Sequence, residues 1–73
     1  MDRQLIAVRP VQGGWSVEWP GLGQELVFLS GAVAEQKARA MAQCVAGIGM
    51  DAEVRVHDRR ETLIGTACYF ASA

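Results

Sequence analysis

The chain has 73 residues, a formal net charge of −1 at pH 7 and a hydrophobic share of 51%. This length fits a single domain over residues 1–73, and the apolar content excludes a disordered chain. A charge so close to zero disfavours nucleic-acid binding and polybasic membrane anchoring. No apolar run is long enough to cross a bilayer and no signal-peptide pattern is present, so we expect a soluble, cytoplasmic protein.

Three strand-like segments come first. Residues 5–10 form an apolar run, and the Gly13-Gly14 pair after it is typical of a tight connection between strands. Residues 15–19 alternate apolar and polar side chains, which predicts a strand with one buried and one wet face. Residues 20–23 have turn chemistry and lead into a third strand over residues 24–29. Together these segments predict a meander.

One helix is predicted over residues 31–48. The hydroxyl of Ser30 can accept a hydrogen bond from the first helical turn, which makes this residue an N-cap candidate. Apolar residues recur at helical spacing on one face, namely Ala34, Ala38, Met41, Val45 and Ile48. This face is rich in alanine, so the helix axis can lie close to a sheet.

Two further strands are predicted after the helix. Residues 52–57 alternate apolar and polar side chains, residues 58–61 form a charged turn, and residues 62–69 or 62–70 form the last strand, bent near Gly65. The order is therefore β-β-β-α-β-β. We predict an α+β fold in which one amphipathic helix packs on one face of a small, mostly antiparallel sheet.

The second face of that sheet is predicted to be covered in part. The second and fourth strands offer polar residues to water, namely Ser16, Glu18, Glu53, Arg55 and His57. Residues 5–8 and 26–29 are instead apolar at every position, a pattern typical of strands covered on both faces. A second copy of the chain is the simplest cover, and scattered surface contacts are the alternative. The candidate interaction residues are Ile6, Val8, Val27 and Leu29.

The two cysteines, Cys44 and Cys68, do not form a zinc-binding pattern. We predict buried free thiols, although a disulfide between them stays open because sequence says nothing of its geometry. No metal site and no cofactor are expected.

His57-Asp58-Arg59 is the one cluster with catalytic potential, because a histidine beside a carboxylate can act as a general base. Adjacent strand residues point to opposite faces, however, and no nucleophile accompanies the pair. A charged hairpin turn is the favoured interpretation, so we expect no catalytic residue and no enzyme.

A local arginine patch offers a second use for the same hairpin. Arg55, Arg59 and Arg60 could contact phosphates if a tryptophan were exposed for base stacking. Interleaved acidic residues nearly cancel this charge, which makes nucleic-acid binding the weaker hypothesis. Arg55, His57 and Arg59 remain candidate interaction residues.

Several motifs resemble a bacterial family called domain of unknown function twenty-one eighty-eight. The resemblance covers about residues 8–69 and is carried by four features: Gly14-Trp15-Ser16-Val17 followed by Phe28, the alanine-spaced helix, the run from Glu53 to Arg59, and Tyr69. The chain departs from the family at Arg60-Glu61, where Asp-Gly is common, and at Ser30-Gly31, where a threonine-led cap is usual. The resemblance implies a similar small α+β fold and no assigned activity.

The sequence therefore predicts a non-enzymatic accessory or protein-interaction domain that forms homodimers and binds an unidentified protein partner. The alternative is a nucleic-acid-associated protein that uses the arginine patch near the last hairpin.

Overall fold

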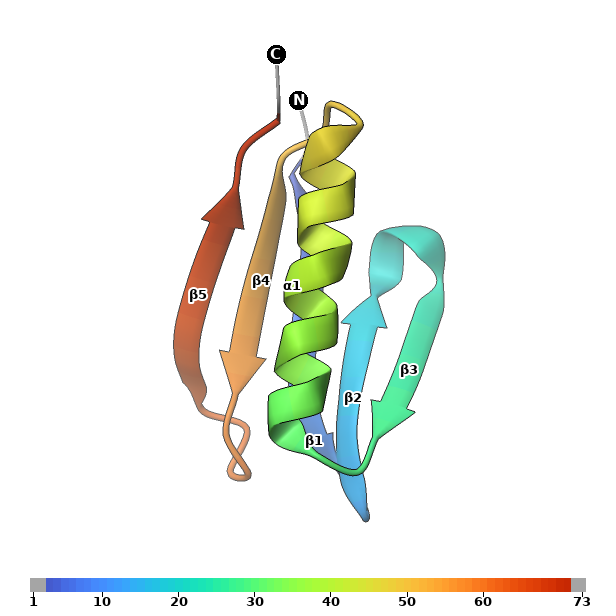
Figure 1. Cartoon of the computed structure of the whole chain (residues 1–73). Helices are drawn as coiled ribbons and strands as arrows, with labels where there is room; N and C mark the ends of the chain where they lie inside the picture. The colour runs from blue at the N-terminus through green and yellow to red at the C-terminus, as the bar shows by residue number, and fades with distance from the viewer. Residues whose placement is uncertain (1–2, 72–73) are drawn as a thin grey trace.

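The computed structural model describes residues 3–71, and the predicted order of elements is confirmed. Figure 1 shows one helix lying across one face of a five-stranded sheet. The elements are β1 (Gln4–Val11), β2 (Gly14–Trp19), a short 3-10 turn (Pro20–Leu22), β3 (Gln24–Phe28), α1 (Gly31–Gly47), β4 (Ala52–His57) and β5 (Leu63–Tyr69). The fold is α+β, as the pattern of segments indicated.

The strands lie in the order β3-β2-β1-β4-β5, so β1 is the central strand and β3 and β5 are the edges. Neighbouring strands are antiparallel except for β1 and β4, which are parallel. This exception follows from the connection, because α1 carries the chain from β3 across the sheet to the far side of β1 (Figure 1). The prediction of a mostly antiparallel sheet is confirmed.

The helix begins as predicted, since the Ser30 hydroxyl accepts a hydrogen bond of 3.3 Å from the Val33 amide. Its buried face differs in detail from the predicted one and consists of Ala34, Ala38, Ala42, Val45 and Ala46. Met41 is only partly buried and Ile48, just beyond the helix, is exposed. The sheet therefore lies against the smallest side chains, and Met41 and Ile48 lie outside this buried face.

The core lies between this alanine face and the middle of the sheet. Ile6, Val8, Val17 and Val54 are fully buried there, and Trp15 and Trp19 pack around them. A Cβ atom at Gly31 would lie 3.0 Å from the Trp15 ring, so the start of the helix approaches the sheet closely. The tryptophans therefore fill the space that alanine leaves, as the sequence indicated.

Candidate functional site

Two of the four apolar residues predicted to lie on the second face belong to the core instead. Ile6 and Val8 are 0% and 1% exposed, and they pair with Val54 and Val17 on the helix side of the sheet. The prediction is wrong for both, because the alternation in β1 turns Leu5 and Ala7 to the second face. An apolar run such as residues 5–8 does not reveal which residues face the helix.

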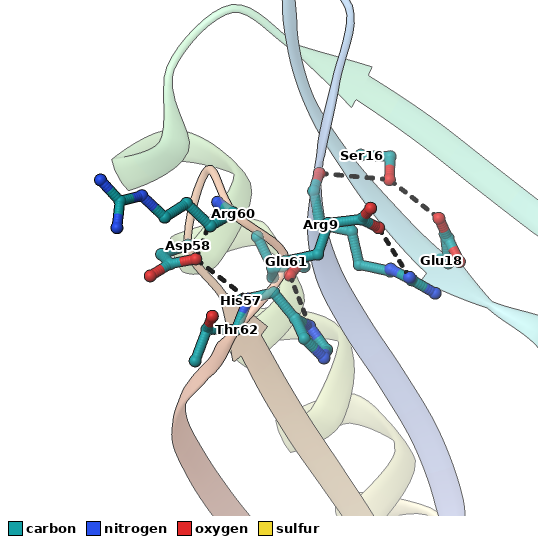
Figure 2. A network of polar contacts seen from close by, with 9 residues as sticks. Arg9, Ser16, Glu18, His57, Asp58, Arg60, Glu61 and Thr62 are labelled. Atoms are coloured by element: carbon teal, nitrogen blue, oxygen red, sulfur yellow. Dashed lines mark hydrogen bonds and ion pairs between the residues drawn. The ribbon is translucent and has the colours of Figure 1, made fainter.

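Polar side chains of the same chain lie over part of the second face of the sheet. Glu53 lies beneath two arginines, accepting hydrogen bonds from Arg3 at 2.6 Å and from Arg55. Ser16 donates to Glu18 at 3.0 Å (Figure 2). Ser16 and Glu53 were expected to face water. Both are buried, because the longer side chains of their hydrogen-bond partners lie over them.

The two arginines stabilise the charged form of Glu53. The hydrogen bond from Arg55, and then the one from Arg3, lowers the pKa of the Glu53 carboxyl below its usual value. The same contact with Glu53 raises the pKa of Arg3. A carboxylate whose pKa is lowered on folding stabilises the fold above its unfolded pKa, and this contribution is lost as the pH falls through the folded value.

We therefore expect the Glu53→Gln variant to be less stable than the parent at pH 7 and to show a smaller fall in Tm on acidification. The difference should shrink as the pH falls below about 5, because Glu53 of the parent becomes protonated and loses its charge. Thermal unfolding followed by circular dichroism across this range provides the test. Glu18→Gln is the matched control, since its partner is the neutral Ser16 hydroxyl. Parallel Tm curves for parent and Glu53→Gln would contradict the assignment.

In the hairpin between β4 and β5, His57 and Asp58 contact different backbone groups. The Nδ1 atom of His57 lies 3.1 Å from the Val8 carbonyl oxygen. The Asp58 carboxylate accepts from the backbone amides of Arg60 at 2.8 Å and Thr62 at 3.0 Å, as Figure 2 shows. Each side chain thus holds backbone in place, and this geometry favours the predicted hairpin turn over a general base.

Two arginines at the same end of the sheet connect this hairpin to β1 and β2 through side-chain contacts. The guanidinium of Arg59 lies 4.5 Å from the centre of the Trp15 ring and donates to the Val11 carbonyl at 3.2 Å. Arg9 forms an ion pair with Glu61 at 2.8 Å (Figure 2). Of the arginine patch predicted from sequence, Arg59 and Arg60 lie in this hairpin, whereas Arg55 is paired with Glu53. Arg9 and Arg59 are both engaged within the chain.

The edge strand β3 carries the other two predicted interaction residues. Val27 is 62% exposed and faces the second side of the sheet, and Leu29 follows the strand at 89% exposed. Sequence reasoning missed three exposed apolar neighbours of this edge: Leu22 before the strand, Leu26 within it and Val33 in the first turn of α1. We call these five residues the β3 edge cluster.

The opposite edge, β5, also exposes apolar side chains. Leu63 and Ile64 lie at its start and Phe70 follows its end. The pairing of β5 with β4 shifts register between Val56, which lies opposite Gly65, and His57, which lies opposite Leu63. This irregularity is where the sequence predicted a bend in the last strand. The regular part of β5 beyond this shift consists mainly of small residues, namely Gly65, Thr66, Ala67 and Cys68.

Both cysteines are free thiols, as expected, but they are exposed and the prediction of burial is wrong. Cys44 lies on a flank of α1, outside the buried alanine face. Cys68 lies opposite Glu53 in the pairing of β4 with β5. It is therefore on the second face of the sheet, in the edge strand β5. Within residues 3–71, no group of three or more His, Cys, Asp and Glu residues is placed to hold a metal ion.

None of the helices in the described part of the chain is long and apolar enough to span a membrane. No family model, curated protein or solved structure matches this chain.

Proposed function

We propose that this chain is a non-enzymatic protein-interaction domain that forms homodimers through an edge of its sheet. The exposed apolar strand β3 carries this proposal. An edge strand presents unpaired N–H and C=O groups, and proteins usually protect such edges with charges, proline or bulges. Residues Gln24–Phe28 contain one charged side chain, Glu25, and Val27 beside it is 62% exposed.

The two faces of the sheet offer less to a partner than its edges do. Helix α1 covers one face (Figure 1), and the ion pairs around Glu53 and Arg9 lie over much of the other. A partner on that second face would have to separate charged groups that already pair with each other. Strand addition at an edge satisfies backbone groups and buries apolar side chains without this cost.

A second candidate, a nucleic-acid-associated protein, is favoured by one observation. Arg9, Arg59 and Arg60 lie at the end of the sheet where β2 begins, and Trp15 is the second residue of that strand. Against it, Arg59 itself covers the Trp15 ring, so base stacking there would require this contact to open. Arg9 is likewise held by Glu61.

Light scattering after size-exclusion chromatography tests the homodimer. We expect a mass of twice 7.9 kDa at micromolar concentration, falling toward 7.9 kDa on dilution. A mass of 7.9 kDa at every concentration would refute the proposed function.

The same measurement with a single-stranded oligonucleotide at low salt separates the two candidates. Attraction to phosphates is strongest under these conditions, so a true binder would form a complex that added salt dissociates. We expect no increase in mass. A salt-sensitive complex that is lost in the Arg59→Ala variant would favour the second candidate instead.

A further inference from the structure

We propose that two copies of this chain join through β3, with the two strands antiparallel and a two-fold axis at Val27, so that both sheets form one continuous sheet. This inference rests on the proposed homodimer and specifies its interface. Three observations carry it: the symmetry that an edge strand allows, the position of the single charge in β3, and the exposed residues of the β3 edge cluster.

Symmetry leaves few registers for such a pair. When two copies of one sheet join edge to edge by antiparallel pairing, the two-fold axis is perpendicular to the sheet and each face stays on its own side. A residue must then oppose a residue from the same face. Within β3, Gln24, Leu26 and Phe28 lie on the helix side, whereas Glu25 and Val27 lie on the second face. The axis therefore passes through a residue that opposes its own counterpart.

Charge and apolar contact distinguish among these registers. An axis at Glu25 places two like charges opposite each other, which is unfavourable. An axis at Leu26 places Glu25 against Val27 and Phe28 against Gln24. An axis at Val27 instead pairs Val27 with itself and Leu26 with Phe28, and it moves Glu25 to the end of the ladder. Among axes within β3, only this register gives three consecutive apolar pairs between strand residues, and Glu25 then lies opposite Leu29 just beyond the strand.

The same axis accounts for the exposed residues outside the strand. Because the two strands are antiparallel, the turn that precedes β3 in one copy lies beside the end of β3 in the other copy. At that end the chain enters α1. Leu22 of one copy then lies at the same end as Leu29 and Val33 of the second. Leu26 and Val27 then lie at the centre of the interface, and the exposed residues Leu22, Leu29 and Val33 lie toward its ends.

The β5 edge is less suited to self-pairing. Its large exposed residues, Leu63 and Ile64, lie at the register shift, where a straight ladder cannot continue. Arg55 lies beside β5 on the second face and Arg39 lies against Tyr69 on the helix side.

Cysteine cross-linking tests the register. We use the full chain with Cys44→Ser and Cys68→Ser, because both natural thiols are exposed, and then introduce Val27→Cys or Leu26→Cys. Opposed residues in antiparallel strands have Cα atoms about 4.5–5.5 Å apart, within the range of a disulfide. We expect mild oxidation to convert Val27→Cys to a covalent dimer faster than Leu26→Cys. Faster cross-linking of Leu26→Cys, or equal rates, would overturn the register.

A charge at the axis tests the edge itself. Val27→Lys removes the apolar contact of two valines and places two lysines opposite each other, so it should raise the dimer dissociation constant by about 100-fold. Ile64→Lys is the matched control, since Ile64 is 63% exposed on the β5 edge, and it should leave the constant unchanged. Circular dichroism confirms that both variants fold.

The outcomes separate this inference from the function on which it rests. A parent chain that is dimeric while Val27→Lys dissociates no more readily than Ile64→Lys would overturn the β3 interface and leave the homodimer standing. Selective dissociation of Ile64→Lys would assign the interface to β5. A monomeric parent would refute both proposals.

Discussion

Replacing Ala38 with leucine is expected to destabilise the fold by about 3 kcal/mol, because overpacking a filled core typically costs this much. Ala38 is fully buried in the middle of α1, against the sheet. A 73-residue domain has a total stability of only about 4–10 kcal/mol. The melting temperature should therefore fall by about 12–24 °C.

Ala40→Leu is the matched control for this prediction. Ala40 is in the same helix but is exposed, so the same change should alter stability by less than about 0.5 kcal/mol. Thermal and urea unfolding of both variants should be compared at one fixed protein concentration, since dimerisation would make Tm depend on concentration. Equal Tm values for Ala38→Leu and Ala40→Leu would contradict the close packing of the helix on the sheet at Ala38.

Gly14→Ala is the second large effect, and it acts on the backbone of the sheet. Gly14 is buried at the start of β2, and a Cβ atom there would overlap the carbonyl oxygen of Phe28. Because the obstacle is backbone, β3 must move away from β2. We expect a loss of about 3 kcal/mol in the free energy of unfolding, measured by urea denaturation.

Gly47→Ala provides the contrast, since nothing lies within 4 Å of a Cβ atom at that position. It should be neutral or slightly stabilising, because alanine favours helix over glycine. The Gly14→Ala variant should also weaken the homodimer, as the displaced strand is the proposed interface. If Gly14→Ala were as stable as Gly47→Ala, the backbones of β2 and β3 would have to be farther apart at Gly14 than in the structure.

Local patterns were enough to predict most of the fold. The alternation of Trp15, Val17 and Trp19 placed β2 and its buried side, and Ser30 marked the start of the helix. These features depend on neighbours within a few residues, where backbone geometry fixes the direction of each side chain. The order of elements and the α+β class followed from them.

The candidate site was predicted less well, because it depends on which strand lies beside which. Ile6 and Val8 were assigned to the wrong face, since a continuous apolar run has no alternation to orient it. Cys68 was expected inside, but β5 is an edge and its second face is open. Val27 and Leu29 are exposed in and beside the edge strand β3, and their role as interaction residues stays a prediction.

The sequence by itself determined the order of the elements, the cap and the alanine-rich character of the buried helix face, because each of these is set by local periodicity and backbone chemistry. Only the tertiary structure decided that β4 returns beside β1 and leaves β3 and β5 as edges. It also brought Glu53 beneath Arg3, a residue 50 positions away. Contacts between distant residues depend on how the whole chain packs, and no short-range pattern records them.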